Sequence, residues 1–208
     1  MSWFSHYYPR IEINSLRRLG SYLGYTPDKS GSARPPTEAF VEKLKFCQRC
    51  GSRMEAKLVE GHQRFICPIC GQILYPRPRL VAAALIEQKN QILLIRRNLD
   101  PGRGLWALPG GYVEQGEAVE VAMQREVLEE TGLQVEAQAL VGLYSGERSP
   151  TVLAVYATGA VRGTLKVLTQ EIQEAAYFSV DALPPLAFPR DRRVIHDWLQ
   201  WVQERHTL

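Results

Sequence analysis

Residues 111–133 read GYVEQGEAVEVAMQREVLEETGL, and this stretch decides the fold of the chain. Apolar residues recur in it at spacings of three and four: Val119, Ala122, Met123 and Val127. This spacing predicts an amphipathic helix that buries one face in a core. We expect the helix to begin at Gly116–Glu117, where the helix dipole favours an acidic residue. Gly132 predicts its end, because glycine readily takes the left-handed conformation that follows many helix C-termini.

Charged residues crowd the last turns of this helix: Arg125, Glu126, Glu129 and Glu130. Glu126 and Glu130 lie one turn apart on one face, and like charges at that spacing cost a helix about 0.2–0.5 kcal/mol per pair. Hard divalent cations such as Mg²⁺ take carboxylate oxygens as ligands. We therefore expect a Mg²⁺ or Mn²⁺ site outside the apolar stripe, and a solvated acidic helix that binds nothing is the alternative.

The stretch resembles the signature of the Nudix hydrolases. The positions that carry the resemblance are Gly111, Glu117, Arg125, Glu126, Val127, Glu129, Glu130, Gly132 and Leu133. The resemblance implies an α/β fold, namely an α/β/α sandwich with a mixed sheet. It also implies that Glu126, Glu129 and Glu130 bind the catalytic metal, with Glu126 and Glu130 foremost. Arg125 and Glu117 would support the loop and the helix, and the carbonyl of Gly110 would complete the metal site.

A catalytic base or further metal ligand comes, in Nudix relatives, from a glutamate well downstream of the signature. The segment LTQEIQEAAYF (168–178) offers Glu171 and Glu174, and we expect Glu171 to take this role. A solvated loop charge is the ordinary alternative for either residue. His196 lies in a C-terminal helical stretch, where we expect a packed or surface histidine rather than a base.

The four cysteines lie in two CxxC pairs, Cys47 and Cys50 in KFCQRCG and Cys67 and Cys70 in FICPICG, with sixteen residues between the pairs. This spacing predicts a tetrahedral structural zinc site with four thiolate ligands. Two disulfides are the alternative, but they are typical of secreted proteins. A redox CxxC would explain one pair only. Four cysteines fill the coordination shell, so we expect this zinc to play no part in catalysis.

These motifs predict the organisation of the chain. Residues 1–44 form an arm with a Pro-, Ser- and Gly-rich linker, residues 45–77 a zinc ribbon, and residues 78–208 the catalytic domain. Within that domain, the runs LVAAALIEQ (80–88) and QILLIRR (91–97) predict a hairpin around Lys89–Asn90. Further strands are expected at 135–144, 151–161 and 175–180, and a helix at 192–204.

Composition excludes some classes of function. The chain has 208 residues, 45% hydrophobic and 23% charged, which is ordinary for a globular protein. Its formal net charge of +3 is too small to indicate nucleic-acid binding by itself. We find no apolar run long enough for a membrane span and no signal peptide in MSWFSHYYPRIEIN, and we expect a cytoplasmic protein.

The substrate class rests on resemblance. A zinc ribbon ahead of a Nudix domain resembles the NADH pyrophosphatase group, but that group has a motif of the SQPWPFP type where this chain has SGERSPTVLAVY (145–156). Other stretches resemble Nudix proteins that act on ADP-ribose and FAD: CGQILYPRP (70–78), NLDPGRGLWALPGGYVEQGE (98–117) and PPLAFP (184–189). We therefore expect a pyrophosphatase that releases AMP and the partner phosphate. Substrate contacts are expected from Trp106, Tyr112 and Arg96, and Tyr144 or Phe188 could also stack on a ring, although core packing is the commoner fate of an aromatic residue.

Two other functions stay open from the sequence. One is an NADH or NAD pyrophosphatase, and the other is a non-catalytic, ligand-sensing Nudix regulator that binds nucleic acid. The complete signature argues against a non-catalytic regulator, and the scattered arginines argue against a nucleic-acid-binding surface. We expect the substrate to be a small dinucleotide or nucleotide sugar. We also expect the protein to form a homodimer and to bind neither a membrane nor a nucleic acid.

Overall fold

The computed structural model describes residues 46–75, 77–146 and 149–206. The predicted arm, residues 1–44, lies outside these ranges. The chain divides between Tyr75 and Pro76 into two compact units, which are described separately.

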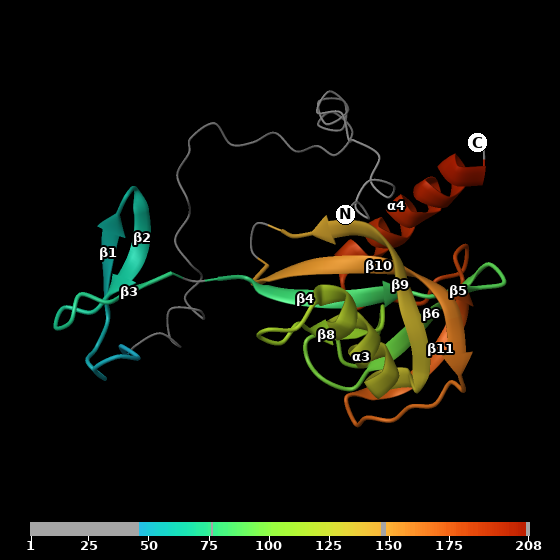
Figure 1. The fold of residues 1–208 in the computed structure, drawn as a ribbon, viewed down its shortest axis with the longest axis horizontal. Coiled ribbons are helices and arrows are strands. Elements are labelled where there is room, and N and C mark those ends of the chain that lie inside the picture. The colour runs from blue at the N-terminus through green and yellow to red at the C-terminus, as the bar shows by residue number, and fades with distance from the viewer. Residues whose placement is uncertain (1–45, 76, 147–148, 207–208) are drawn as a thin grey trace, which may run out of the picture. The chain divides into compact units, whose positions relative to one another are not determined.

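The first unit is a small antiparallel sheet of three strands in the order β1-β2-β3 (Figure 1). The strands are β1 (Glu55–Val59), β2 (His62–Ile66) and β3 (Ile73–Leu74). Its core consists of Cys47, Met54, Phe65 and Cys67. So few buried side chains give little hydrophobic stabilisation, and domains of this size usually need a metal or disulfides to fold.

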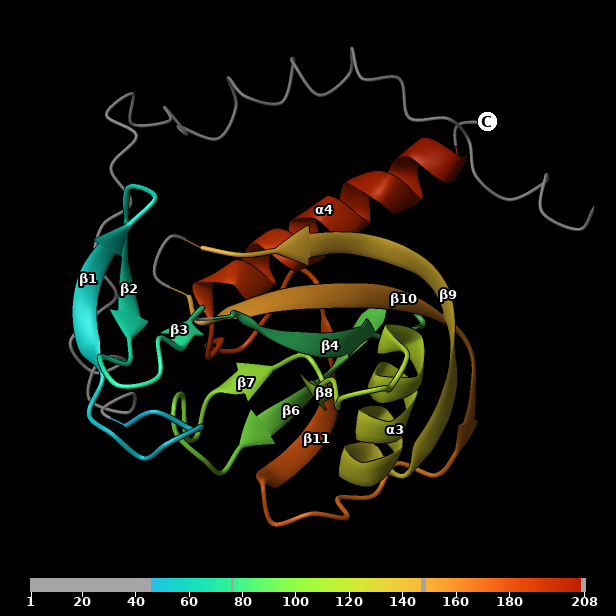
Figure 2. The same ribbon diagram turned by 60° about the vertical axis from the view of Figure 1, so that its left-hand side comes forward.

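The second unit contains two four-stranded sheets between two helices (Figures 1 and 2). One sheet has the order β8-β4-β10-β9; in the other, β6 pairs with β11, β5 and β7. The elements are β4 (Arg79–Leu85), β5 (Glu87–Gln88), β6 (Gln91–Arg97), β7 (Trp106–Ala107), β8 (Gly110–Tyr112), α3 (Val119–Thr131), β9 (Leu133–Tyr144), β10 (Thr151–Gly163), β11 (Ile172–Ser179) and α4 (Pro189–His206). Because β4 and β10 run parallel and their other neighbours antiparallel, the first sheet is mixed, and the predicted α/β sandwich is confirmed.

The side chains of β4 show how the layers form. Ala82 and Ala84 pack in the cluster that contains Met123 and Val127 of α3. Their neighbours Ala83 and Leu85 pack instead in the cluster that contains Trp198 and other residues of α4. Successive residues of a strand face opposite sides, so a strand covered on both faces is apolar throughout. This explains the unbroken run LVAAAL in the sequence.

The predicted hairpin has its turn at the predicted residues, but its first strand is shorter than predicted. Lys89 and Asn90 have positive φ of 51° and 62°, and they join β5 to β6 as a two-residue turn. However, β4 ends at Leu85 and pairs with β8 and β10 in the other sheet. Ile86, fully buried, carries the chain between the two sheets. No turn residue separates Leu85 from Glu87, which is why residues 80–88 read as one strand.

Helix α3 has the predicted buried face and the predicted end. Gly132 has φ of 69°, and its N–H donates to the carbonyl of Leu128 at 2.9 Å. The predicted start was two residues too early, because α3 begins at Val119. Glu117 lies in the preceding turn, where its N–H donates to the carbonyl of Glu114 at 3.1 Å. The side chain of Glu117 is thereby left to bind Arg125 rather than to cap the helix.

The second helix and the edge of the mixed sheet complete the unit. Helix α4 includes the predicted residues 192–204 and begins three residues earlier, at Pro189. None of the helices in the described part of the chain is long and apolar enough to cross a membrane. Strand β9 forms an edge of the mixed sheet and pairs with β10 through three register shifts. Its side chains Leu140 and Leu143 are exposed.

Candidate metal sites and active site

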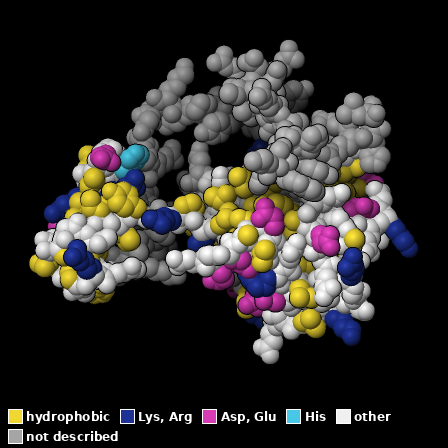
Figure 3. Space-filling model, in the orientation of Figure 1, with side chains coloured by type: hydrophobic (Ala, Val, Ile, Leu, Met, Phe, Trp, Pro, Cys, Tyr) yellow, Lys and Arg dark blue, Asp and Glu magenta, His cyan; other side chains and the backbone are white. Residues whose placement is uncertain are grey.

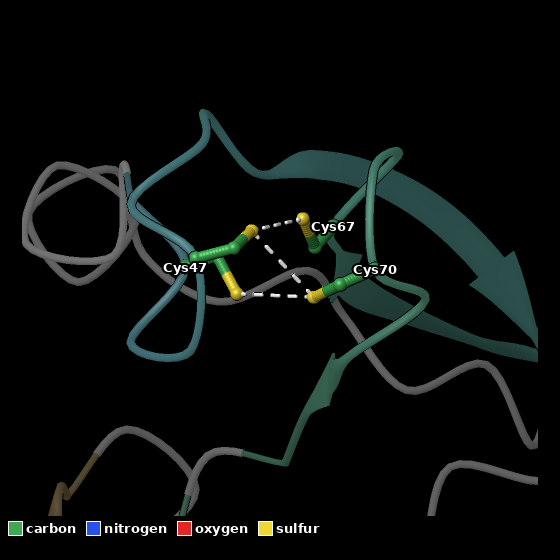
Figure 4. Close-up of side chains that lie close together, drawn as sticks. Cys47, Cys67 and Cys70 are labelled. Atoms are coloured by element: carbon green, nitrogen blue, oxygen red, sulfur yellow. Dashed lines mark hydrogen bonds between the residues drawn. The ribbon is translucent and has the colours of Figure 1, made fainter.

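The four cysteines of the first unit converge on one point. The sulfurs of Cys47 and Cys70 are 3.6 Å apart, those of Cys50 and Cys67 are 3.4 Å apart, and all four lie within 4.8 Å of one another. Figure 4 shows the labelled side chains pointing toward each other from two turns. Sulfurs around a tetrahedral zinc ion lie about 3.8 Å apart, because each Zn–S bond is about 2.3 Å. The cysteines are free, and the cluster fits a zinc ion.

Two matching turns build this cluster. In the first, the N–H of Gly51 donates to Cys47 O, and the N–H of Cys47 donates to Ser52 O. The second repeats the pattern with Gly71, Cys67 and Gln72. Gly51 and Gly71 have φ of 73° and 72°, which glycine adopts without strain. Ser52 lowers the pKa of the Cys50 thiol to about 6, which favours the thiolate that metals bind.

Arg125 organises the acidic end of the second unit. Its guanidinium donates to both carboxylate oxygens of Glu117 at 2.9 and 3.0 Å, and to Glu126 Oε1 at 2.8 Å. It also donates to Glu129 Oε2 at 3.2 Å and to the carbonyl of Tyr112 at 3.1 Å. The guanidinium holds the pKa of Glu117 below its usual range. Figure 3 shows acidic side chains gathered around a basic one where β8 meets α3.

Glu130 is buried, which the sequence pattern did not predict. It is 7% exposed, and its Oε2 accepts the backbone N–H of Gly110 at 2.9 Å. Burial raises the pKa of Glu130 to about 8, against the hydrogen bond from Gly110, and Glu126 and Glu171 raise it further. A carboxylate in such a place is stabilised by a nearby cation. The prediction that the acidic residues lie outside the buried face is therefore wrong for Glu130.

Glu126 fits against a glycine. A Cβ on Gly111 would collide with the Glu126 carboxylate, so any other residue at this position would displace the end of that side chain. Burial raises the pKa of Glu126, while its contact with Arg125 lowers it, and Glu129 and Glu171 raise it. Gly110 is more tightly confined, because a Cβ there would meet the backbone of Ala82 and Ala83. The two glycines thus let β8 run directly beside the carboxylates of α3.

The predicted metal ligands are not gathered as the cysteines are. Within residues 46–75, 77–146 and 149–206, the cysteines form the one set of three or more His, Cys, Asp or Glu side chains with ligand atoms close enough for an ion. Glu126 and Glu129 instead turn an oxygen to Arg125. The donor set still suits Mg²⁺ or Mn²⁺: Glu126 and Glu130 are both carboxylates with raised pKa, placed beside a glycine pair.

The two downstream glutamates have different surroundings. Glu171 lines an open pocket of about 1010 Å³ together with Glu129. The negative charge of Glu171 raises the pKa of both Glu126 and Glu130. Glu174 pairs with Arg96, at 3.9 Å between Nη1 and Oε2. The structure therefore brings Glu171 to the acidic end of α3 and holds Glu174 on β11. The exposed His196 lies beside Asp197 on α4, at 3.7 Å, as expected of a surface histidine.

Asn98 positions Glu171, and sequence reasoning missed it. Its backbone N–H donates to the carbonyl of Glu171 at 2.8 Å, and its Nδ2 donates to the carbonyl of Gln170 at 2.8 Å. Its Oδ1 accepts from Gln173 Nε2 at 3.1 Å. Asn98 thus ties the end of β6 to the loop before β11. A lone Asn after a strand gives no signal of such a role, because its partners lie over seventy residues away.

Most of the side chains expected to contact the substrate make contacts within the protein instead. Trp106 packs edge-on against Phe178, with centroids 4.6 Å apart, and belongs to the core. Tyr144 is buried and not available for stacking. Tyr112 is partly exposed, but the guanidinium of Arg79 covers its ring at 3.2 Å from the centroid. The Nε of Arg96 donates to Gly104 O at 3.0 Å, in addition to the pairing of Arg96 with Glu174. Phe188 lies under Arg97 and Arg190.

Comparison with known families decides the class of this site. The model described as NUDIX domain matches residues 76–199, and the model described as Nudix N-terminal, the zinc ribbon, matches residues 45–76. The chain belongs to the Nudix family. The predicted resemblance is thereby confirmed, and the chain is an enzyme of the Nudix pyrophosphatase kind.

Named Nudix relatives fall into two groups. The chain is 40% identical over 132 residues to the ADP-ribose pyrophosphatase of Methanocaldococcus jannaschii. The matched residues make up 62% of this chain and 77% of that protein. It is 34% identical over 148 residues to the NAD-capped RNA hydrolase NudC of Pseudomonas aeruginosa, covering 70% of this chain. The match spans 51% of NudC, so this chain corresponds to about half of that relative.

Solved Nudix structures support the fold. A Nudix hydrolase from Nitrosomonas europaea superposes with a TM-score of 0.65 at 30% identity, covering 79% of this chain and 93% of that one. A MutT Nudix hydrolase from Burkholderia pseudomallei gives a TM-score of 0.54 at 32% identity, covering 58% and 98%. Both are similar to this chain in sequence as well as in fold.

Proposed function

We propose that this Nudix enzyme hydrolyses the pyrophosphate bond of ADP-ribose or FAD with the help of Mg²⁺ or Mn²⁺. The products would be AMP and the partner phosphate. The observation that carries the proposal is that Gly110 donates to the buried Glu130 and Gly111 lies against the Glu126 carboxylate, while the charge of Glu171 raises the pKa of both glutamates. The similarity to an ADP-ribose pyrophosphatase supports the choice of substrate.

The carboxylates would divide the work of binding and catalysis. Glu126 and Glu130 would hold the divalent cation, with Glu129 and the carbonyl of Gly110 completing the site. Bound there, the cation would neutralise charge on the diphosphate and lower the pKa of a bound water. Glu171 would accept the proton of the water whose oxygen attacks phosphorus, or act as a further ligand. The bond between that phosphorus and the bridging oxygen then breaks.

Arg125 and Glu117 would act by holding other groups. The two hydrogen bonds between them fix the guanidinium, which places Glu126 and Glu129 and ties the carbonyl of Tyr112 to α3. When the carboxylates rotate to bind a cation, Arg125 keeps Glu117 as its partner. The arginine therefore supports the loop before the helix whether or not the metal is present.

A panel of substrates tests the proposal. ADP-ribose, FAD, NADH, diadenosine polyphosphates, coenzyme A and 8-oxo-dGTP are incubated with Mg²⁺ or Mn²⁺, and products are separated by chromatography. We expect AMP to appear fastest from ADP-ribose or FAD. No metal-dependent turnover of any compound would contradict the proposed function.

NAD-containing substrates are the second candidate, because several relatives are named NAD-capped RNA hydrolases. An RNA oligonucleotide with a 5′ NAD cap belongs in the panel beside free NADH. Faster release of product from the capped RNA than from ADP-ribose would favour this function. The chain segment SGERSPTVLAVY, in place of the NADH-type motif, argues for ADP-ribose.

We also propose that the enzyme is a cytoplasmic homodimer with zinc in its ribbon. Four free cysteines close enough to share one metal ion suit a reducing compartment. Light scattering after gel filtration should give twice the monomer mass. Atomic emission analysis should find one zinc per chain. A monomer mass would contradict the proposed homodimer, and a zinc-free protein would contradict the proposed zinc site.

A further inference from the structure

Three exposed leucines line the open pocket that also contains Glu129 and Glu171. Leu99 follows β6, Leu128 lies on α3, and Leu168 precedes β11. Their exposed fractions are 48%, 42% and 60%. Single exposed leucines are common on protein surfaces, but several around one hollow are typical of a ligand site. The leucines therefore give the pocket an apolar surface for which the proposed metal chemistry has no use.

The segment that carries Leu168 is held against the end of α3. The N–H of Lys166 donates to the carbonyl of Thr131 at 2.9 Å, and the N–H of Leu168 lies 3.4 Å from the carbonyl of Glu130. A Cβ on Gly132 would lie 3.5 Å from Leu168 Cδ1, so the leucine side chain reaches the glycine that ends the helix. This side of the pocket is thus attached to the helix that carries the candidate metal ligands.

Asn98 holds the other end of the same segment. Its backbone N–H donates to the carbonyl of Glu171, and its Nδ2 donates to the carbonyl of Gln170, both at 2.8 Å. Leu99 is the next residue in the chain, so the bonds of Asn98 also fix the backbone from which Leu99 extends. The pocket is therefore largely formed before a ligand arrives, which lowers the entropy lost on binding.

The charge of the pocket limits what it can bind. The described residues that line it include two carboxylates, Glu129 and Glu171, and no basic side chain. An anionic group placed among the leucines, away from a bound cation, would meet like charges without a counter-charge. A strongly polar group would lose water there without gaining hydrogen bonds from the leucines. The chemistry of the lining therefore favours an uncharged, largely apolar group.

We infer that Leu99, Leu128 and Leu168 bind the uncharged ring system of the substrate half that is released beside AMP, and that they favour FAD over ADP-ribose. This inference rests on the proposed function, in which Glu129 and Glu171 act on the diphosphate at the same pocket. The group joined to the diphosphate then extends over the leucines. The fused rings of a flavin end in a dimethylbenzene edge without hydrogen-bonding groups, whereas a ribose would leave most of the 1010 Å³ unfilled.

Adenine is the other ring that these substrates carry. It has donors and acceptors around its edge, and these would lose water against the leucines. Adenine is also common to FAD and ADP-ribose, so a pocket that bound it would not distinguish the two compounds. The two placements of the substrate therefore predict different kinetics.

The test compares kcat/KM for FAD and for ADP-ribose, with Mg²⁺, in three variants of the full chain: Leu99→Gln, Leu128→Gln and Leu143→Gln. Glutamine is similar to leucine in size but places a polar amide in the pocket. Leu143 is the matched control, because it is 65% exposed on β9 and does not line the pocket. The thermal midpoint of each variant is measured beside the wild type.

We expect Leu99→Gln and Leu128→Gln to lower kcat/KM for FAD about tenfold and kcat/KM for ADP-ribose by less than about twofold. Leu143→Gln should leave both constants within about twofold of the wild type. Turnover of ADP-ribose by the same protein sample separates a loss of flavin binding from unfolding, since unfolding would remove both activities.

Equal losses with the two substrates in Leu99→Gln and Leu128→Gln would place the shared adenosine half in the pocket and overturn the inference. An unchanged preference between the substrates in both variants would also overturn it, because the leucines would then contact neither ring.

If the wild type hydrolyses none of these compounds, the proposed function fails, and riboflavin binding then decides the role of the leucines. Riboflavin is uncharged and needs no metal, and its binding is followed by fluorescence anisotropy. It should bind the wild type and Leu143→Gln about fivefold more tightly than Leu99→Gln. Riboflavin that does not bind the wild type, or that binds all three proteins equally, would contradict the inference.

Discussion

The two candidate metal sites of this Nudix protein are built in opposite ways. In the ribbon, two identical backbone turns set the four sulfurs at 3.4–3.6 Å across the pairs, close to the spacing around zinc. In the catalytic unit, the carboxylates of α3 are placed by side-chain contacts with Arg125 and by the backbone of Gly110. A site fixed by backbone turns holds its ligands in one arrangement. A site fixed by a counter-charge can change its ligands when metal and substrate bind.

This difference suits the two tasks. Four thiolates leave no open position on a zinc ion, so the ribbon site contributes to stability. Glu129 and Glu171 line an open pocket, and burial favours the neutral, protonated form of Glu130. A cation bound beside Glu130 would favour its ionised form, so ionisation of Glu130 and metal binding are coupled.

The largest effect should come from removing a carboxylate. Glu126→Gln or Glu130→Gln should lower kcat about a hundredfold or more, because each deletes a negative charge that would hold the metal. The fold should persist, as judged by circular dichroism. AMP release from ADP-ribose with Mg²⁺ is the measurement, and Glu136→Gln, at an exposed position on β9, is the matched control. Wild-type turnover in both variants would remove the proposed metal site.

Arg125→Lys should have a smaller effect. Lysine keeps the charge but cannot make the paired hydrogen bonds to Glu117 together with those to Glu126 and Tyr112. We expect kcat to fall about tenfold and the thermal midpoint to drop by a few degrees, roughly the loss of one or two charged hydrogen bonds. Turnover and thermal melts of Arg125→Lys are compared with those of Arg192→Lys, an exposed arginine on α4. Equal behaviour of the two variants would mean that Arg125 holds nothing that catalysis needs.

The pH dependence of stability should report the burial of Glu130. Its pKa of about 8 in the folded chain lies above the unfolded value of about 4.3, so the folded state binds more protons between these values. Stability should therefore fall as pH rises, by at most about 1.4 kcal/mol per pH unit from this group. Thermal melts without Mg²⁺ from pH 6.5 to 8 should show a falling midpoint in the wild type.

The control for this prediction is Glu130→Gln, which cannot ionise. Its midpoint should vary less over the same range, and added Mg²⁺ should flatten the wild-type curve by favouring the ionised carboxylate. Asp191, with a pKa of about 6, titrates mainly below this window. Parallel curves for the wild type and Glu130→Gln would show that Glu130 does not carry a raised pKa.

The smallest effect on turnover should come from the ribbon. Cys47→Ser, or removal of zinc by a zinc-selective chelator followed by fresh Mg²⁺, should unfold residues 46–75. Because the catalytic unit has its own core, kcat should stay within about twofold. Limited proteolysis followed by mass spectrometry should place the new cleavages in the ribbon, and Ser52→Ala, which keeps all four thiols, serves as control. A large loss of turnover would mean that the two units depend on each other.

Local patterns in the sequence predicted a large part of this molecule. The cysteine spacing, the apolar face of α3 and the end of that helix at Gly132 all depend on residues within one short window, and the structure agrees with each. The burial of Glu130 was not predictable in this way. It arises because β8, twenty residues earlier in the chain, passes over the helix at Gly110. The change of sheet at Ile86 is not visible in the sequence either, because the buried Ile86 continues the apolar run of β4 up to the polar strand β5.

The role of Asn98 lies beyond local reasoning altogether. It joins backbone groups that are seventy or more residues away, and this residue type is not unusual where it stands. The preference for Glu171 over Glu174 came from family resemblance. The structure adds a physical argument, because Arg96 opposite Glu174 gives that residue a partner on the sheet.

The register shifts of β9 have a consequence for solubility. An edge strand offers unpaired N–H and C=O groups to any passing chain, and a long apolar one is a template for aggregation. Strand β9 is twelve residues long and carries the exposed Leu140 and Leu143, yet its pairing with β10 is broken at three places. Each irregularity bends and twists the strand. We therefore expect a foreign strand to pair with β9 over short stretches only, which would limit fibre growth along that edge.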